Sequence, residues 1–258
     1  MTRGAPNRDA APDFEQLVRG KRVVVVGPAT HTVGAALGRE VDSYDLVVRL
    51  NEAIAHMPFD RATRDDIGGR ADIVYGNQVV LRTLITGRTS DAARRSWIDA
   101  GLKYFVCTNN ALDYANTGEP ARVARHPDPR LVADCDDALR RLEGSIRLRI
   151  VHAASALLSK WMGGHFGRTG FIALYDLLSF DVRCLHVTGM TFYHGGGHRY
   201  PQGRDPLHPL KNRDGTWARD AGGRGHDSYL ELEIMRVLAR CFQGRLTVDA
   251  ELNALLSL

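Results

Sequence analysis

A short stretch near the amino terminus restricts the fold most strongly. Residues 23 to 26 are four consecutive valines, an apolar and β-branched run typical of a strand buried on both faces of a parallel sheet. Gly27 follows where the chain must turn sharply, and a second apolar run, residues 46 to 50, leads into Asn51. The pattern predicts two parallel strands joined by a short helix, with Arg49 and Asn51 near the carboxyl end, where ligands bind in open α/β sheets. From these spacings alone, a βαβ unit without a ligand fits equally well.

Strand-like and helix-like segments alternate along most of the chain. Strands are expected at 22–26, 46–50, 73–75, 104–107, 184–188 and 245–248, and helices at about 33–40, 78–86, 91–100, 130–143, 151–162, 170–180 and 227–241. This alternation predicts a Rossmann-like α/β fold, a mostly parallel sheet with helices on both faces. With 258 residues and 44% apolar composition, the chain can bury one core. We expect a flexible tail over residues 1–18 and a single catalytic domain over residues 19–258.

Three separated phrases of the sequence resemble the motifs of one enzyme family. V-V-G ends at Gly27 and precedes REVDSYDLVVRLN at residues 39–51, Arg168-Thr169-Gly170 opens a second phrase, and HDSYLE at residues 226–231 has the form H-x-x-x-x-E. In this order they resemble the long, short and very short motifs of the eukaryotic-type sialyltransferases, glycosyltransferase family 29. The phrase VTGMTFY at residues 187–193 and the closing LTVDAELNALL are also similar to the bacterial sialyltransferases of family 42.

These resemblances imply a GT-A-variant, sialyltransferase-like architecture and an inverting, metal-independent glycosyltransferase. The enzyme would move a sialic-acid-type sugar from a CMP-activated donor to a glycan hydroxyl. His226 takes the role of general base, which suits histidine because its ordinary pKa is about 6.5. His198 and His208 each resemble the phosphate-contacting histidine of the eukaryotic-type family, and both remain candidates. Tyr193 and Tyr200 resemble the paired phosphate-binding tyrosines of the bacterial family.

The expected nucleotide-binding residues lie at strand ends, in turns or at a helix start. They are Gly27, Thr30, Asn51, Asn77, Thr169 and Gly170. The first glycine should let the backbone approach CMP, the two asparagines should reach ribose or base, and the Thr-Gly pair should bind through a helix amino terminus. Both families favour asparagine where this chain has Pro28, so that side-chain contact is either lost or supplied by Thr30.

Residues 193–225 break the alternation of strands and helices. The segment is rich in Gly, Pro, Arg and His and has no periodicity, which predicts a long active-site loop; a disordered surface loop is the alternative. A metal site is a competing hypothesis, but the glycine-rich spacing of His194 and His198 does not place them on one helical face. Asp134 and Asp136 form a D-x-D phrase at the expected start of a helix, where acids complement the dipole. We therefore expect no metal and no cofactor, with the CMP-sugar as a substrate.

Charge and hydropathy restrict the partners. The net charge is +4, and the positive charge is almost all arginine, which suits phosphates and carboxylates. Because the arginines are scattered among 30 acidic residues, nucleic acid is not an expected partner. The expected partners are a CMP-activated acidic sugar and a glycan or glycolipid acceptor. No apolar run reaches the length of a membrane span, so we expect no transmembrane segment, with peripheral membrane association left open.

The cysteines indicate a reducing compartment. None has C-x-x-C spacing, and free, buried thiols are expected at Cys107, Cys135, Cys184 and Cys241. The eukaryotic-type family joins its long and short motifs by a disulfide, whereas Val23 and Asp181 occupy those places here. With no signal-like run, the sequence fits a bacterial cytoplasmic protein, which could be peripheral at the inner membrane face, or an excised catalytic domain, and the missing cysteines favour the first.

Three alternatives and two minor residues complete the sequence-based expectations. A Kdo transferase with a CMP-Kdo donor would use the same site. A nicotinamide-binding oxidoreductase needs G-x-G-x-x-G and an acid after the second strand, where this chain has GPATHTVG and Asn51. An inert glycan-binding homologue is the third alternative. His186 is expected to be a satisfied core histidine, and Glu231 is expected to support or cap the helix after His226.

Overall fold

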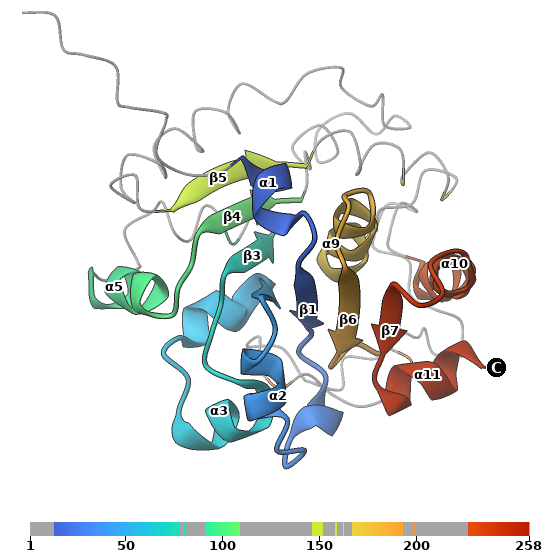
Figure 1. Ribbon diagram of the computed structural model, residues 1–258. Coiled ribbons are helices and arrows are strands. Elements are labelled where there is room, and N and C mark those ends of the chain that lie inside the picture. The colour runs from blue at the N-terminus through green and yellow to red at the C-terminus, as the bar shows by residue number, and fades with distance from the viewer. Residues whose placement is uncertain are drawn as a thin grey trace, which may run out of the picture.

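The computed structural model is built around one parallel β-sheet (Figure 1). It describes residues 13–77, 80, 91–108, 146–151, 158, 162, 167–192, 194, 199 and 227–257. The strands are β1 Arg22–Val26, β2 Leu46–Leu50, β3 Ile73–Gly76, β4 Tyr104–Cys107, β5 Arg147–Ile150, β6 Cys184–Thr188 and β7 Leu246–Val248. The α-helices are α1 Phe14–Val18, α2 Gly38–Asp42, α3 Arg61–Ile67, α5 Asp91–Asp99, α9 Thr169–Leu178, α10 Ser228–Cys241 and α11 Ala250–Leu256. Two 3₁₀ turns are η1 Thr30–Thr32 and η2 Asn51–His56.

The order of the strands places β1 at a reversal of the sheet. The seven strands run in the order β5-β4-β3-β2-β1-β6-β7, and every pair is parallel. The chain moves outward from β1 through β2 to β5 and then returns to the other side of β1 with β6. Ligands of such sheets bind outside the carboxyl ends of the strands near this switch point. The predicted α/β class and parallel sheet are confirmed.

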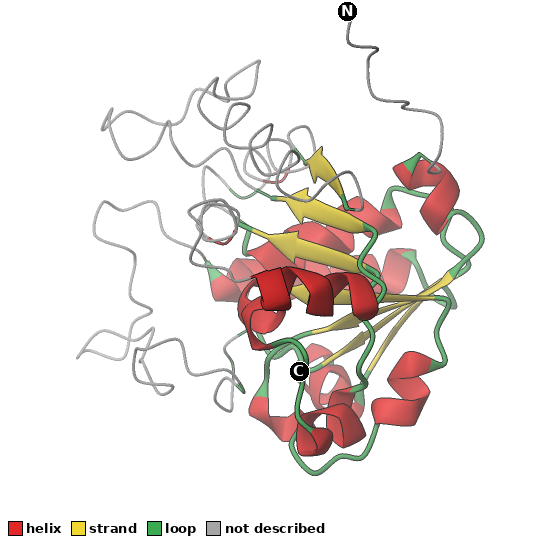
Figure 2. Cartoon of the chain, turned by 90° about the vertical axis from the view of Figure 1, so that its left-hand side faces the viewer, coloured by secondary structure: helices red, strands yellow, loops and turns green. Residues whose placement is uncertain are grey.

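The valines of β1 alternate between two cores, one on each face of the sheet. Val23 and Val25 pack in a cluster with apolar residues of α1, α9, α10 and α11. Val24 and Val26 pack in a second cluster with residues of α2, α3 and α5. Figure 2 shows helices on both sides of the twisted sheet. Burial on both faces explains why this strand is continuously apolar.

Part of the expected flexible tail is a packed helix. Residues 1–18 were expected to be loose, but α1 begins after Asp13, whose side chain accepts a hydrogen bond from the Phe14 amide. Phe14 and Val18 are buried, with exposures of 3% and 0%. Phe14 also packs edge-on against Tyr104, with ring centroids 5.2 Å apart. The prediction of a tail is wrong for this helix because its apolar residues complete the core.

The first crossover also differs from the expected helix at 33–40. Residues 30–32 form the 3₁₀ turn η1, and α2 starts only at Gly38. Gly34 and Ala36 have positive φ values of 77° and 53°, which a right-handed helix cannot contain. The expected helices at 91–100, 170–180 and 227–241 are confirmed by α5, α9 and α10. Those expected at 78–86, 130–143 and 151–162 lie largely outside the described residues.

Strand β5 was missed because two of its four residues are arginines. Arg149 donates to Asp176 of α9 through Nη1 and Nη2, the latter at 2.9 Å from Oδ1, and Tyr75 Oη donates to Asp176 Oδ2 at 2.7 Å. Arg149 also lies over the Phe14 ring, 4.4 Å from its centroid. Burial raises the pKa of Tyr75 well above its ordinary value. This paired charge lets an arginine-rich strand lie at the edge of the sheet.

Candidate functional site

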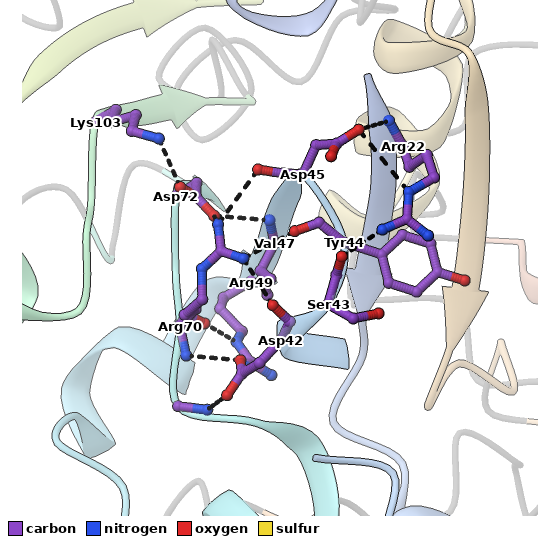
Figure 3. Close-up of polar contacts among 11 residues, drawn as sticks. Arg22, Asp42, Ser43, Tyr44, Asp45, Val47, Arg49, Arg70, Asp72 and Lys103 are labelled. Carbon is purple, nitrogen blue, oxygen red and sulfur yellow. Dashed lines mark hydrogen bonds and ion pairs between the residues drawn. The ribbon is translucent and has the colours of Figure 1, made fainter. Parts of the chain in front are cut away.

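The acidic residues of the long-motif phrase lie at the amino edge of the sheet, away from the strand ends that bind ligands. Asp42, at the end of α2, accepts hydrogen bonds from the amides of Gly69 and Arg70 at 2.9 and 3.1 Å. The Arg70 side chain donates to the carbonyl oxygens of Asp42 and Tyr44, both at 2.8 Å. Figure 3 shows that these contacts join the segment before β2 to the segment before β3. These residues stabilise the fold and are not positioned to contact a ligand at the carboxyl edge.

Asp72 joins three strands at the same amino edge. Its Oδ2 accepts from the Val47 amide and from Arg70 Nη2, each at 2.9 Å, and its Oδ1 accepts from Lys103 Nζ at 2.8 Å (Figure 3). The Asp72 side chain is 3% exposed. A buried carboxylate with three donors is well compensated. Asp45 extends the network to β1, because its Oδ2 accepts from the Arg22 amide at 2.7 Å.

Arg49 is a structural residue, which corrects the expectation that it faces a ligand. It is fully buried, and its guanidinium donates to the carbonyl oxygens of Ile67, Gly68 and Arg70 at 2.8 to 3.0 Å. These carbonyls include the end of α3, so the arginine satisfies groups that the helix cannot bond internally. Because side chains alternate along a strand, Arg49 points into the core that contains Val47.

Asn51 and Asn77 meet at the carboxyl ends of β2 and β3. The Asn77 amide donates to Asn51 Oδ1 at 3.2 Å, and Asn77 Oδ1 accepts from the Val80 amide at 3.0 Å. Asn51 has a positive φ of 44°, a conformation in which asparagine is enriched. Both side chains are partly exposed, and their Nδ2 groups have no recorded partner among the described residues. They therefore offer amide donors to a ligand at this edge.

Gly27 has a packing role at the β1–β6 junction. A Cβ atom on Gly27 would lie 2.2 Å from the Gly189 carbonyl oxygen and 2.4 Å from Met190 Cγ. The Gly27 amide donates to the Thr188 carbonyl, and the Ala29 amide donates to the Gly189 carbonyl, both at 2.8 Å. Pro28 has no amide hydrogen, so residues 27–29 have no spare backbone donor. The expected approach of this turn to CMP cannot use those amides.

Thr30 opens η1 directly after this turn, next to an ion pair that the sequence did not predict. Arg199, a residue of the expected loop, donates to Asp66 Oδ2 at 2.9 Å and to Thr32 Oγ1 at 3.3 Å, and its amide donates to the Pro28 carbonyl. The Arg199 and Asp66 side chains are only 8% and 11% exposed. Arg199 therefore contacts the turn after β1 through both its backbone and its side chain.

The short-motif and very-short-motif phrases are joined by a buried ion pair. Glu231 of α10 is 0% exposed and accepts from the Arg168 amide at 2.6 Å and from Arg168 Nη1 at 3.0 Å. Burial raises the pKa of Glu231, although the Arg168 charge opposes the shift. Arg168 is the residue before α9, and Glu231 therefore fixes the start of that helix. Glu231 was expected to have a supporting role, and its partner in that role is Arg168.

Thr169 and Gly170 form the first turn of α9 and pack against strands at the switch point. A Cβ atom on Gly170 would lie 2.7 Å from Met190 Cε and 3.1 Å from Leu50 Cδ1. The Arg168 side chain makes no capping hydrogen bond at this helix start. Thus Asn51, the end of β6 and the amino terminus of a ten-residue helix converge on one edge.

Several expected site residues lie outside the described part of the chain. These are His198, His208, His226, Tyr193 and Tyr200, together with Asp134 and Asp136. Their expected roles stay predictions. Within the described ranges, no group of three or more His, Cys, Asp or Glu residues could hold a metal ion. Nor does any helix in those ranges combine the length and apolar character of a membrane span.

Two other expectations can be compared with described residues. His186 is partly buried in β6, its Nδ1 lies 2.9 Å from Thr247 Oγ1, and its ring stacks on Tyr44 with centroids 5.9 Å apart. Burial lowers the pKa of His186 and its ring has the expected hydrogen-bond partner, but the side chain is only partly buried, so the expected core position is not confirmed. Cys107, Cys184 and Cys241 are free thiols, as expected. Cys107 is buried, but Cys184 is only partly buried and Cys241 is exposed, which corrects the expectation of burial; Cys135 lies outside the described residues.

Comparisons with known proteins give limited similarity. No family profile and no curated protein match the chain. One similar solved structure is a mammalian sialyltransferase, with a TM-score of 0.45 and 17% identity over 92% of this chain and 71% of that chain. Another is a mammalian sialyltransferase in complex with Gal-β-1-3GalNAc-ortho-nitrophenol, with a TM-score of 0.44 and the same identity and coverage. TM-scores below 0.5 carry no argument about function, which therefore depends on the chain's own residues. The likeness to bacterial family 42 stays a prediction.

Proposed function

We propose that the protein is an inverting, metal-independent glycosyltransferase that transfers a sialic-acid-type sugar from a CMP-activated donor to a glycan hydroxyl. One observation carries the proposal: the three motif-like phrases, far apart in sequence, are in direct contact. Gly170 of the second phrase packs against Leu50 of the first, and Glu231 of the third binds Arg168 of the second. A chance set of short sequence matches would not assemble at one sheet edge.

In this proposal, the carboxyl edge binds the nucleotide by hydrogen bonds. The Nδ2 groups of Asn51 and Asn77 reach the ribose or base, and the first turn of α9 at Thr169 and Gly170 faces negative charge. Thr30 supplies a hydroxyl next to the turn after β1. A CMP-sugar has a single phosphate, whose charge hydroxyl, imidazole and amide donors can compensate without a divalent ion.

The chemistry is assigned to residues carried over from the sequence resemblance. His226 removes the proton from the acceptor hydroxyl as the sugar leaves CMP. His198 or His208, with Tyr193 and Tyr200, compensates the charge of the departing phosphate. Asp227 directly follows His226 and caps α10, because its Oδ1 accepts from the Leu230 amide at 3.0 Å. This cap defines where the chain carrying the proposed base enters the helix.

Two features of the described site disfavour a nicotinamide-binding oxidoreductase. A dinucleotide-binding turn uses its backbone amides to bind the pyrophosphate, whereas the Gly27 and Ala29 amides donate to carbonyl groups of the β6 end. An acid normally ends the second strand of that site, and this chain has Asn51 there. A CMP-Kdo donor would use the same edge and remains the alternative donor.

Titration calorimetry with CMP, CMP-sialic acid, CMP-Kdo, UDP-sugars and NAD tests the donor class, followed by transfer assays with β-galactoside acceptors. We expect CMP and one CMP-sugar to bind and UDP-sugars and NAD to fail. Transfer should continue in excess EDTA, and the product should have the anomeric configuration opposite to the donor. Binding of NAD without CMP, or loss of transfer in EDTA with recovery in Mn²⁺, contradicts the proposal. CMP-sugar binding without transfer to any acceptor supports an inert homologue.

A further inference from the structure

His31 forms an ion-pair contact across the carboxyl edge that the sequence did not indicate. It lies in η1, directly after β1, and its Nε2 is 2.9 Å from Oδ2 of Asp249. Asp249 follows β7 and caps α11, 218 residues away in sequence. The His31 side chain is 26% exposed and that of Asp249 is 13% exposed. The contact therefore joins the ends of β1 and β7, the strands on either side of β6, and leaves part of the imidazole open to solvent.

The surroundings of Asp249 define which atom of the His31 ring is the donor. Besides His31, the Asp249 carboxylate accepts from Thr188 Oγ1 at 3.0 Å, from the Gly189 amide at 2.8 Å and from the Leu252 amide at 2.8 Å. Burial acts to raise the pKa of Asp249, but these hydrogen bonds outweigh it and hold the pKa below its ordinary value. An ionised carboxylate only accepts hydrogen bonds, so Nε2 of His31 is the donor to Asp249. Nδ1, the other ring nitrogen, is not used in this contact.

The other polar groups near this turn are already engaged. The Gly27 and Ala29 amides donate to the end of β6, and Pro28 has no amide hydrogen. Among the described arginines of the motif-like phrases and the expected loop, Arg168 pairs with Glu231 and Arg199 pairs with Asp66. Within residues 27–32, His31 is the side chain that can bring a positive charge to a ligand phosphate.

We propose that His31, held by Asp249, binds the phosphate of the nucleotide donor. The inference rests on the proposed function and deepens it. As an imidazolium, the ring donates through Nε2 to Asp249 and through Nδ1 to a phosphate oxygen, and the carboxylate balances its charge. Asn51 lies two strands from the β6 end, a separation of roughly 10 Å. A nucleoside monophosphate spans such a distance, with its base near the asparagines and its phosphate near His31.

A comparison of CMP with cytidine tests the contact, because the two ligands differ only in the phosphate. Calorimetric titrations use the wild type, His31→Gln and His186→Gln. We expect His31→Gln to weaken CMP binding about tenfold or more and to leave cytidine binding within about twofold. His186→Gln is the matched control, since His186 is a partly buried histidine in the middle of β6 whose partner is Thr247. Its ratio of CMP to cytidine affinity should equal that of the wild type.

The outcomes separate this inference from the proposed function. If the wild type binds neither CMP nor cytidine, the proposed function fails. If the wild type binds CMP and His31→Gln keeps the same ratio of CMP to cytidine affinity, the His31 contact is overturned while the function stands. If His31→Gln does not fold, diethylpyrocarbonate labelling of wild-type His31, read by mass spectrometry, decides. CMP should protect the ring and cytidine should not; equal labelling with the two ligands refutes the contact.

Discussion

The two edges of the sheet differ in how completely their polar side chains are satisfied. At the amino edge, both carboxylate oxygens of Asp42 accept from backbone amides, and those of Asp72 accept from an amide and two basic side chains. At the carboxyl edge, Asn51 uses its oxygen for Asn77 and its Nδ2 has no partner among the described residues, and His31 uses one ring nitrogen for Asp249. Edges with spare donors suit ligands, whereas saturated edges stabilise the fold.

This difference separates the residues of one motif-like phrase by function. Asp42, Asp45 and Arg49 bind protein groups before β2 or beneath it, and Asn51, the last residue of the phrase, reaches the ligand edge. A resemblance to a motif therefore does not assign ligand contact to each of its residues. Variants at the two edges should separate in the same way, with effects on stability at one and on binding or turnover at the other.

The largest effect is expected for His226→Ala, at the residue proposed as the general base. Loss of a general base should lower turnover by about 10²- to 10⁴-fold, and CMP affinity should stay within a few-fold because the base acts on the acceptor. Initial rates of transfer and calorimetry with CMP measure the two quantities. His198→Ala and His208→Ala are the comparison, since the one that contacts phosphate should weaken CMP binding as well. Near-normal turnover of His226→Ala would remove the base assignment.

At the amino edge, Asp72→Ala should destabilise the fold by about 3 kcal/mol without changing CMP affinity. The change leaves the buried Val47 amide without its acceptor, while Arg70 and Lys103 are partly exposed and can regain water. Urea unfolding measures the loss, and Asp72→Asn, which keeps an acceptor, should lose less. Weaker CMP binding by folded Asp72→Ala would show that the two edges are coupled.

The fold class could be predicted from the sequence, but the different roles of the amino and carboxyl edges could be predicted only in part. The valines of β1 require a doubly covered strand, and six of the seven described strands were predicted from such runs. Strand β5 was missed because Arg149 is compensated by Asp176, more than twenty residues away and on another element. The pairs His31–Asp249 and Arg199–Asp66 likewise depend on long-range packing, which local periodicity does not encode.

The carboxyl edge should show a pH dependence of stability through Asp249. Its folded-state pKa is lowered from 3.8, so the folded state binds fewer protons than the unfolded state near that pH. Its contribution is present above pH ~4 and is lost as the pH falls further. Asp249→Asn should therefore be less stable than the wild type at pH 7, by about 2 kcal/mol, with a difference that shrinks below pH ~4. Thermal unfolding at several pH values measures the difference, and a constant gap would contradict the assignment.

Glycine substitutions compare the packing of the two edges. In Gly27→Ala the new Cβ would overlap the backbone oxygen of Gly189, and we expect a loss of about 1–3 kcal/mol in the free energy of unfolding. Gly69→Ala at the amino edge is the control. Its Cβ would lie 3.3 Å from Cδ of Arg64, a flexible side-chain atom that can move. Urea unfolding should show little change for Gly69→Ala, and equal losses would mean that the β1–β6 junction is not the tighter contact.

The smallest change in free energy is expected for Asn51→Asp, which replaces a side-chain amide of the long-motif phrase by a carboxylate. Asn51→Asp keeps an oxygen for the Asn77 amide, loses the Nδ2 donor and adds negative charge near an anionic ligand. CMP affinity should fall about tenfold, or about 1.4 kcal/mol, with little change in the unfolding midpoint. Asp45→Asn makes the reverse exchange at the amino edge, where Asp45 accepts from the Arg22 amide. Calorimetry should find its CMP affinity unchanged, because the altered group lies at the opposite edge of the sheet. Similar CMP affinities for the two variants would show that Asn51 does not contact the nucleotide, whereas a loss in Asp45→Asn alone would place the ligand at the opposite edge.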